Sequence, residues 1–320
     1  MFQNTKLTFP ETIKLLLTLF NLFSIFIKQY LYLITITLFF CLFLFIWFKY
    51  IEKKIIGLYP SNFPNKINRG KADETKQTLV CFGDSITHGN VSYNWVKYLR
   101  RKLPYLNIYN AGMNADLSHT LLLRMDDIIL CRPDFITILI GTNDVNATLS
   151  EKNLQRYISR GKIMPKEEAN LKSYLDNYEN IISRLKSTTS AQIALVTLPL
   201  ISEDLSFQGN YITQLYNNEI KTLSEKHQIE LLDFRQKQLE LLPKKSYNNF
   251  WSYKKSRIMM NCSIFIRYTF RVSWNFNSKM FSNYTSPDNI HLNETSGNLL
   301  LSLVLEWVSK KQAKSSLELG

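Results

Sequence analysis

The chain has 320 residues, of which 45% are hydrophobic and 20% are charged, so it can bury a sizeable core in one or two domains. Its net charge of +13 favours an anionic neighbour, such as a membrane surface, a nucleic acid or an acidic substrate. The lack of any C-x-x-C pair argues against a disulfide framework or a zinc site. We expect buried free thiols at Cys41, Cys81, Cys131 and Cys262.

The N-terminal region has the composition of a membrane anchor. Nineteen residues from Tyr30 to Phe48 carry no charge. At about 1.5 Å per residue, a helix of this length spans about 28 Å, close to the ~30 Å of a hydrocarbon core. A cleaved signal peptide would have a shorter apolar core and small residues at its cleavage site. The sequence therefore predicts an uncleaved transmembrane helix over residues 30–48.

Residues 1–29 are apolar but more mixed in composition. Their apolar stretch, residues 13–27, is interrupted by Lys14 and by a few small polar side chains. Two structures fit it: an interfacial amphipathic helix, or a short first span that turns back at Lys28 and Gln29. The turn would be very tight, so we favour a single span.

Basic residues are more frequent after the predicted span than before it. Lys49, Lys53, Lys54, Lys66, Arg69 and Lys71 follow it, whereas Lys6, Lys14 and Lys28 precede it. The bias is modest, and by the positive-inside rule it favours a cytoplasmic location for the rest of the chain. We expect a single-pass membrane protein with an N-terminal anchor.

The rest of the chain divides into a linker and one α/β domain. Residues 49–77 contain prolines, glycines and charges without a period, which predicts a linker. From residue 78 onward, apolar strand-like runs at 79–82, 107–109, 135–140, 193–198 and 230–234 alternate with helical patterns at 95–103, 118–130, 167–186, 211–227 and 299–308. This alternation predicts a parallel, doubly wound sheet in a domain over 78–312, followed by a tail over 313–320.

One segment of that domain, residues 243–287, departs from the pattern. It has no acidic residue, and its eight lysines and arginines are interleaved with eleven aromatic side chains. This chemistry suits an anionic bilayer surface, where aromatic rings lie at the level of the headgroups. It could also stack nucleotide bases, or be an extra piece of fold with a solvated basic face. The membrane anchor favours lipid as a partner, and no nucleic-acid partner is expected.

A serine lies just past the end of the first predicted strand. The apolar run 79–82 ends at Gly83, and Ser85 follows two residues later. In open α/β sheets, ligands bind in the crevice beyond the carboxyl ends of the strands. Ser85 is therefore a candidate nucleophile, which requires a base, a group that orients the base, and donors for an oxyanion.

Candidates for these groups occur elsewhere in the chain. Asp288 and His291 are three residues apart, which places them on the same side of a helical turn and suits the orienter and base of a Ser-His-Asp triad. Gly112 follows the second predicted strand and Asn143 follows the third. With the N–H of Ser85, the Gly112 N–H and the Asn143 amide would form a three-donor oxyanion hole.

Three further polar residues flank these motifs. Asp84, His88 and Asp144 are expected to line the substrate site, and the two carboxylates are expected to bind loop amides rather than act as acids. A metal site would need more ligands than the sequence clusters there, so no metal is expected.

Together, Gly83-Asp84-Ser85, Gly112, Gly141-Thr142-Asn143-Asp144 and Asp288-x-x-His291 resemble the sequence blocks of the SGNH (GDSL) hydrolase superfamily. The resemblance extends over about residues 78–308. It implies a flavodoxin-like three-layer α/β/α sandwich with a five-stranded parallel sheet, and ester hydrolysis through Ser85 without a cofactor. By the same resemblance, Gly112 and Asn143 are oxyanion donors, His291 is the base and Asp288 orients it. Residues 243–287 have no counterpart in the compact family pattern.

Three functions remain open. The leading hypothesis is a membrane-anchored serine esterase acting on lipid or acyl-lipid esters, similar to a lysophospholipase or thioesterase. The second is a carbohydrate O-acetylesterase or acyltransferase of the cell envelope. The third is a non-catalytic membrane module that keeps the fold. The α/β-hydrolase elbow G-x-S-x-G is absent, because Thr87 occupies its last position.

Overall fold

The computed structural model describes residues 9–164, 169–243 and 249–318. The chain divides into two compact units, Met1–Lys54 and Ile55–Gly320, and each is described by itself. We call them unit 1 and unit 2.

Unit 1 consists, in its described part, of the helix α1 (Phe9–Ile51) and the first residues of a short π-helix, Glu52–Ile56. The helix is continuous through Lys28 and Gln29, so the alternative of a turn at this point does not fit the structure. Its 43 residues span about 64 Å, about twice the thickness of a hydrocarbon core, so only part of α1 can cross one. Within the described residues, only the helical stretch Thr12–Ile56, which includes α1, is long and apolar enough to cross a membrane.

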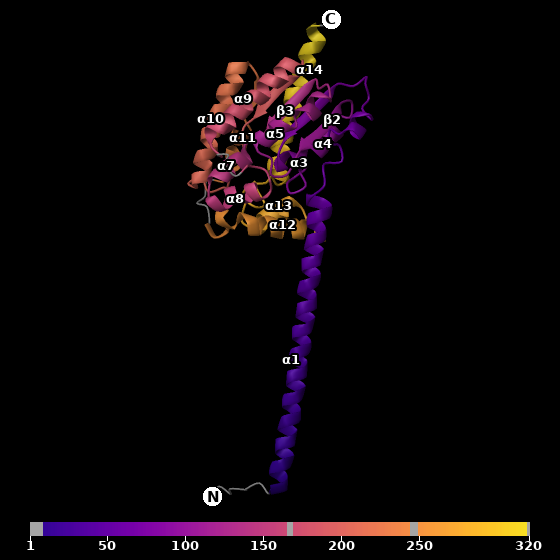
Figure 1. Cartoon of the computed structure of the whole chain (residues 1–320), viewed down its shortest axis with the longest axis vertical. Coiled ribbons are helices and arrows are strands. Elements are labelled where there is room, and N and C mark those ends of the chain that lie inside the picture. The colour runs from indigo at the N-terminus through magenta and orange to yellow at the C-terminus, as the bar shows by residue number, and fades with distance from the viewer. Residues whose placement is uncertain (1–8, 165–168, 244–248, 319–320) are drawn as a thin grey trace. The chain divides into compact units, whose positions relative to one another are not determined.

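Unit 2, drawn in Figure 1, is built on a parallel sheet. Its strand order is β2-β1-β3-β4-β5. The strands are β1 (Thr78–Gly83), β2 (Asn107–Gly112), β3 (Phe135–Leu139), β4 (Gln192–Val196) and β5 (Glu230–Leu232). Their order changes direction at β1, which pairs with both β2 and β3. The predicted five-stranded parallel sheet is confirmed.

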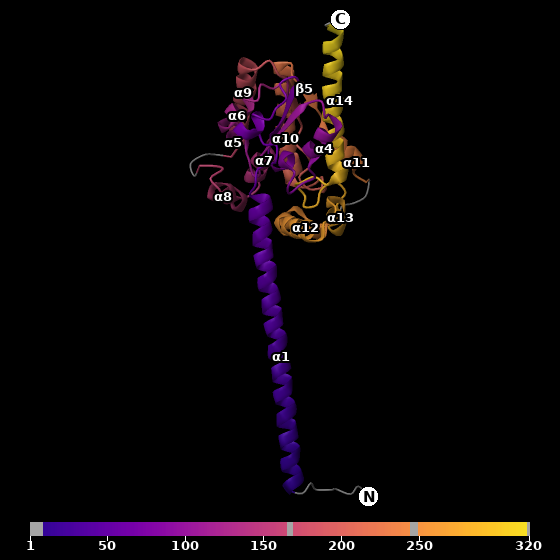
Figure 2. The ribbon, with the colours of Figure 1, turned by 90° about the vertical axis from the view of Figure 1, so that its right-hand side faces the viewer.

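Helices cover both faces of the sheet, so its central strands are buried along their whole length and are mostly apolar. Residues 79–82 of β1 are completely buried, as expected for a strand covered on both sides. Figure 2 shows α5, α6 and α9 on one side of the sheet and α4, α11 and α14 on the other. The helices of these two layers are α4 (Trp95–Lys102), α5 (Ser118–Leu123), α6 (Met125–Ile129), α9 (Leu171–Thr188), α11 (Phe234–Leu241) and α14 (Glu294–Glu318). The predicted three-layer sandwich is confirmed.

The structure differs from the sequence prediction at several boundaries. The helix predicted over 118–130 is interrupted at Arg124 and forms α5 and α6. The last helix, α14, extends to Glu318 and includes most of the predicted tail. The second half of the predicted linker packs on the sheet edge, where the Asn62 side chain donates to the Ile108 carbonyl of β2 at 2.9 Å. Helices α7 (Thr142–Thr148) and α8 (Glu151–Ser159) were not predicted.

The four cysteines fall into two groups. Cys81 and Cys131 are buried, as expected, whereas Cys41 and Cys262 are exposed. The prediction of a buried thiol is therefore wrong for the last two, because Cys41 lies on α1 and Cys262 lies on the outer side of a surface helix.

That surface helix belongs to what we call the cap segment, residues 249–283. It contains α12 (Ser256–Phe270), α13 (Trp274–Met280) and two short 3-10 turns. Figures 1 and 2 both show α12 and α13 at one end of unit 2, the end that also carries α8. The predicted basic aromatic segment 243–287 is thus a helical addition to the sandwich. Its residues 244–248 lie outside the described part of the chain.

Candidate functional site

The turn from β1 into a short helix positions Ser85. β1 ends at Gly83, and α3 (Ser85–His88) begins two residues later. Asp84 caps this helix, since its side chain accepts a hydrogen bond from the Ile86 N–H at 2.9 Å. Gly83 must be a glycine, because a Cβ atom there would lie 2.5 Å from the Leu139 carbonyl oxygen. Ser85 therefore lies at the carboxyl edge of the sheet, held by backbone geometry.

The structure brings Ser85, His291 and Asp288 together in one chain of contacts. Ser85 Oγ lies 3.0 Å from His291 Nε2, although the two residues are 206 positions apart. His291 Nδ1 lies 2.6 Å from Asp288 Oδ2. All three side chains are more than nine-tenths buried. The distances are those of hydrogen bonds, so a proton can pass between the hydroxyl and the imidazole.

The spacing of Asp288 and His291 predicted a shared helical turn, but the two residues do not lie on one. α14 begins only at Glu294, and Asn289 has a left-handed backbone with φ of 72°. The pair is close because Asp288 Oδ1 accepts the N–H groups of Ile290 and His291, at 3.0 and 2.8 Å. Such a turn closed by an aspartate side chain leaves its second oxygen free for the imidazole.

Contacts with the loop after α3 fix the histidine loop beside Ser85. The Leu292 N–H donates to Ser92 Oγ at 3.0 Å, and the Tyr93 N–H donates to the Leu292 carbonyl at 2.8 Å. Both partners lie within eight residues of Ser85 in the sequence. The nucleophile and the histidine are therefore parts of one hydrogen-bonded assembly.

Charges around His291 favour its protonated form. Burial by itself lowers the pKa of the imidazole, but the charge and hydrogen bond of Asp288, with the charge of Asp84, outweigh it and raise the pKa above the ordinary value of 6.5. Burial raises the pKa of Asp84 to about 7. His88 shows the opposite effect, because burial without a charged partner lowers its pKa to about 4. His88 is therefore neutral at neutral pH.

The Asn143 amide lies close to Asp84 and is held in one orientation. Its Nδ2 donates to the Asp116 carbonyl at 2.9 Å and approaches Asp84 Oδ2 at 3.3 Å. Its Oδ1 accepts a hydrogen bond from the Tyr157 hydroxyl at 2.7 Å, which directs the amide nitrogen towards Asp84. Tyr157 was not predicted from the sequence, because it lies on α8, a helix that was itself not predicted, and nothing in its local pattern marks it.

Gly112 does not present a free N–H. This N–H donates to Asn110 Oδ1 at 3.0 Å, and the Asn110 amide in turn donates to the Thr87 and His88 carbonyls. A Cβ atom on Gly112 would lie 2.1 Å from the His88 nitrogen, so the glycine allows β2 and α3 to approach closely. The predicted donor role of Gly112 is therefore corrected: its N–H is already bonded within the protein.

Ala115, three residues further on, was also missed. It has a left-handed backbone with φ of 63°, which is uncommon for a residue with a side chain. Its N–H has no partner among the described residues. The loop that carries it is held on both sides, by a hydrogen bond from the Met113 N–H to the Gly83 carbonyl and by the bond from Asn143 to Asp116. No sequence signal marks this position, because alanine is usually right-handed.

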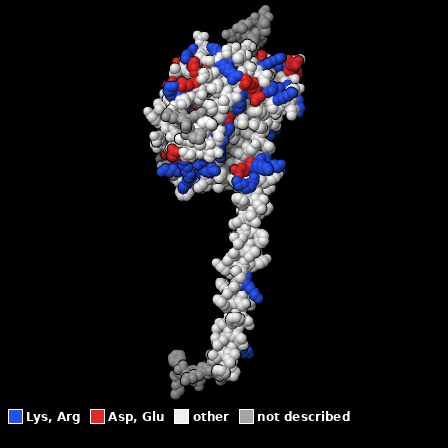
Figure 3. All heavy atoms as spheres, viewed as in Figure 1, with Lys and Arg blue, Asp and Glu red and all other residues white. Residues whose placement is uncertain are grey.

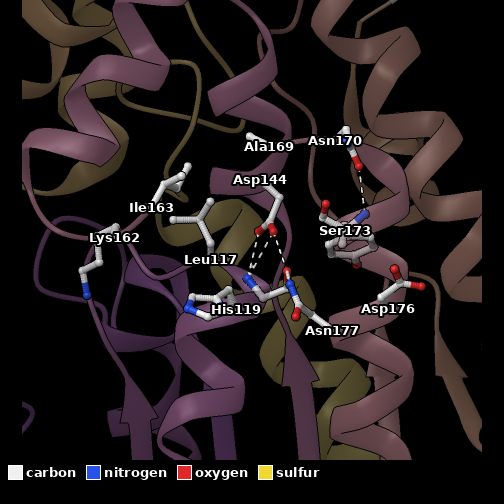
Figure 4. A pocket seen from close by; sticks show the side chains of 12 residues that line it. Leu117, His119, Asp144, Lys162, Ile163, Ala169, Asn170, Ser173, Asp176 and Asn177 are labelled. Atoms are coloured by element: carbon white, nitrogen blue, oxygen red, sulfur yellow. Dashed lines mark hydrogen bonds between the residues drawn. The ribbon is translucent and has the colours of Figure 1, made fainter. Parts of the chain in front are cut away.

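Asp144 turns away from the Ser85 cluster towards a neighbouring cavity. Its carboxylate accepts the N–H and the hydroxyl of Ser118, and burial raises its pKa to about 6. This carboxylate lines a cavity of about 300 Å³. Figure 4 shows it together with His119, Lys162 and Asp176, which also line the cavity. Among the described residues, Ser85 and His291 do not line this cavity. Asp84, by contrast, lies inside the Ser85 cluster, and both carboxylates bind loop amides.

The described His, Cys, Asp and Glu side chains do not cluster as metal ligands. Within residues 9–164, 169–243 and 249–318, no group of three or more His, Cys, Asp or Glu residues could hold a metal ion. The chemistry that this arrangement can perform is proton transfer between a hydroxyl and an imidazole beside a carboxylate, which is the basis of nucleophilic catalysis by serine.

Comparisons with known proteins agree with this chemistry. The sequence matches the GDSL-like Lipase/Acylhydrolase family over residues 81–254. The matched region includes Ser85, Gly112 and Asn143, and it ends before Asp288 and His291. No curated protein matches the chain.

Solved structures are similar to this chain at low sequence identity. An acetyl xylan esterase is 19% identical with a TM-score of 0.50, and the alignment covers 72% of this chain and 99% of that one. A GDSL-like lipase from Bacteroides thetaiotaomicron is 16% identical with a TM-score of 0.49, covering 77% and 95%. A lipase/acylhydrolase from Enterococcus faecalis is 16% identical with a TM-score of 0.47, covering 73% and 96%. By its family match and its fold, the chain belongs to the GDSL-like lipase/acylhydrolase family and is a hydrolase of ester bonds.

Proposed function

We propose that this protein is a serine esterase in which Ser85 is the nucleophile, His291 the general base and Asp288 the group that orients it. The observation that carries the proposal is the 3.0 Å distance from Ser85 Oγ to His291 Nε2, with Asp288 Oδ2 at 2.6 Å from the other ring nitrogen. The carboxylate favours the tautomer with a proton on Nδ1. Nε2 is then free to accept the proton of the serine hydroxyl.

The reaction follows from this arrangement. His291 takes the proton of Ser85 as its oxygen attacks the ester carbonyl carbon, which forms a tetrahedral intermediate with a negatively charged oxygen. The imidazolium then protonates the leaving alcohol as the carbon–oxygen bond of the ester breaks. A water molecule, activated by the same imidazole, hydrolyses the acyl-serine and restores Ser85. No cofactor is required.

Hydrogen-bond donors near Ser85 would stabilise the oxyanion. The N–H of Ser85 and the Asn143 amide remain the candidates from the sequence. The Ala115 N–H replaces that of Gly112, because it has no partner among the described residues and lies in a strained conformation. Strained backbone of this kind is concentrated at functional sites, which supports the assignment. In the free enzyme the Asn143 amide nitrogen donates to Asp116 and faces Asp84, so we expect it to shift towards the oxyanion during the reaction.

The substrates that we propose are acyl esters presented at a membrane surface, such as lipid or acyl-lipid esters. The long apolar helix α1 supports this class, because 19 uncharged residues suit a bilayer and would hold the enzyme beside its lipids. His88 and Asp84 lie close to Ser85 and would contact the substrate.

A fluorophosphonate probe tests the nucleophile directly. The full chain in detergent or nanodiscs should react with the probe, and Ser85→Ala should abolish the reaction. Ser187→Ala, a change of an exposed serine on α9, is the matched control and should react like the wild type. Absence of labelling in folded wild-type protein at pH 8 would overturn the proposal and favour a non-catalytic module.

The acyl chain length then tests the substrate class. Lipid esterase activity predicts that p-nitrophenyl esters of longer acyl chains are hydrolysed at least as well as the acetate. A strong preference for acetate would contradict the lipid assignment and favour an O-acetylesterase of carbohydrates.

A further inference from the structure

The large apolar and aromatic side chains of the cap segment fall into two sets, one packed within the segment or against the sandwich and one largely exposed. Trp251 packs edge-on against Phe281, with ring centroids 4.7 Å apart, and Tyr253 stacks on Phe207 at 4.6 Å. Trp274 is 3% exposed. These residues form a small core that attaches the cap segment to the sandwich.

The second set faces solvent. Phe250, Ile258, Phe270, Phe276 and Met280 are all between 45% and 64% exposed. On α12, Ile258 and Cys262 are exposed on one side, while Met259 and Ser263 are buried on the other. Single exposed apolar residues are ordinary, but a group of five within about thirty residues marks an interaction surface.

The same surface is strongly basic. Lys254, Arg257, Arg271 and Lys279 are exposed, and none of them takes part in an ion pair with another described residue. No acidic residue occurs between Pro243 and Pro287 that could neutralise them. Figure 3 shows Lys and Arg atoms gathered along the end of unit 2 at which Figure 1 places α12. Cations with apolar and aromatic side chains between them are the chemistry of proteins that bind anionic bilayers.

The beginning of unit 2 lies beside this surface. The Ile55 carbonyl accepts a hydrogen bond from the Asn90 side chain at 2.9 Å, and the Tyr268 hydroxyl of α12 donates to the Asn90 carbonyl. Ile55 comes seven residues after Phe48, the end of the uncharged stretch of α1. Seven residues extend at most about 25 Å. If that stretch crosses a membrane, the cap segment must therefore be near the membrane surface.

The carboxyl edge of the sheet lies at the same end of unit 2. The Asn114 side chain, next to Ala115, donates to the Ile56 carbonyl at 2.9 Å. The cap segment also contacts the loop that carries Asp288 and His291: the Asn289 side chain donates to the Trp251 carbonyl at 3.0 Å, and Ser263 Oγ donates to the Pro287 carbonyl at 3.2 Å. The cap segment is thus bonded directly to the loop that carries Asp288 and His291.

We propose that the outer face of the cap segment, formed by its exposed apolar residues and by Lys254, Arg257, Arg271 and Lys279, docks on the anionic surface of the bilayer that α1 crosses. This contact turns the carboxyl edge of the sheet towards the lipid. The docking itself is independent of the reaction. Its consequence, that the esters reach Ser85 from the bilayer, rests on the function proposed above.

A fluorescent label on Cys262 tests the docking in the full chain. In a Cys41→Ser variant, Cys262 is the exposed cysteine, because Cys81 and Cys131 are buried. The labelled protein is placed in nanodiscs of phosphatidylcholine alone or with 30% phosphatidylglycerol. In the anionic discs we expect a blue-shifted emission and quenching by brominated lipid, and both should weaken at high salt.

Two matched triple variants distinguish docking by the cap segment from a general effect of the protein's net charge. Lys254→Glu/Arg257→Glu/Lys279→Glu should lose the shift and the lipid quenching. Arg100→Glu/Lys102→Glu/Arg132→Glu has the same net charge but changes the other edge of the sheet, before β2 and β3, and should behave like the wild type. A label at Ser187→Cys in a Cys41→Ser/Cys262→Ser background should remain unquenched in all discs.

The proposal is overturned if the Cys262 label responds equally in neutral and anionic discs, or if the two triple variants behave alike. It is also overturned if a single-stranded oligonucleotide, and not anionic lipid, changes the emission. The melting temperature of each variant, measured in the same discs, confirms that it is folded, and hydrolysis of p-nitrophenyl acetate is measured separately. If docking is seen and the wild type hydrolyses no ester, the proposed function fails while the docking stands.

Discussion

Ser85 and His291 meet at 3.0 Å, but two regions of different construction bring them there. Ser85 comes shortly after the end of β1, and Asn143 comes shortly after the end of β3. The paired strands of the sheet therefore set the positions of both residues. His291 follows no strand. Its loop is held by side chains from elsewhere, among them the Glu203 carboxylate, which accepts the N–H groups of Tyr284 and Thr285.

This difference shows that the sheet fixes the positions of Ser85 and Asn143 but not that of His291. The family match covers Ser85 and Asn143, which we call the strand-borne half of the site, and it ends at residue 254, near the start of the cap segment and before the loop of His291, the histidine half. A position set by a sheet depends on many backbone hydrogen bonds, whereas the position of His291 depends on a few side-chain contacts, several of them with the cap segment. We therefore expect the strand-borne half to be rigid and the histidine half to be sensitive to changes around it.

The largest expected effect tests the histidine half. His291→Ala should lower kcat by about 10⁴- to 10⁶-fold, as removal of the general base does in serine hydrolases. Steady-state hydrolysis of p-nitrophenyl acetate measures it. His227→Ala is a matched control. His227 Nε2 also lies 2.7 Å from a carboxylate oxygen, that of Glu179, but His227 is not part of the Ser85 cluster. Activity of His291→Ala within tenfold of the wild type would exclude it as the base.

The next effect tests the strand-borne half. Asn143→Ala should lower kcat by about 10²- to 10³-fold, the loss typical of one oxyanion donor. KM should change less, since the interaction strengthens in the transition state. A near-normal kcat in a variant with an unchanged melting temperature would refute the assigned role.

The dependence of activity on pH tests His291 in the histidine half together with Asp84, which follows β1. Only neutral His291 can accept the serine proton, so activity should be lost as pH falls through its pKa. Since Asp288 and Asp84 raise that pKa, the midpoint should lie above 6.5, with about tenfold loss per pH unit below it. Asp84, with a pKa of about 7, faces His291, and its protonation would lower the histidine pKa. Asp288→Asn should move the midpoint down, whereas a profile flat to pH 4 would exclude a histidine base.

The smallest effect tests how Asn143 is oriented. Tyr157→Phe removes the hydrogen bond to Asn143 Oδ1, which is worth about 1 kcal/mol, so kcat should fall about fivefold with little change in KM. Tyr178→Phe is the control, because that buried hydroxyl has no partner among the described residues and should be dispensable. Equal kcat values for the two variants would show that the hydrogen bond from Tyr157 is not required to orient Asn143.

Local patterns were sufficient for much of the fold. The five strands were predicted because a sheet covered on both faces requires continuous apolar runs, and residues 79–82 are such a run. The helices α7 and α8 were missed because they are short and polar, and α12 because its two sides are both apolar and give no clear period. Ser85 could be placed from the sequence, since a residue that follows a strand directly lies at the edge of the sheet.

What the sequence by itself determined is the parallel sheet, the long apolar helix and the residue types of the site, because all three depend on patterns within a few turns of chain. Only the tertiary structure decided which N–H groups are free, as it ties Gly112 to Asn110 and leaves Ala115 without a partner among the described residues. It also decided how Asp288 reaches His291, through a turn in place of a helix. The physical reason is that hydrogen-bond partners and left-handed backbone depend on neighbours distant in sequence, which no local pattern records.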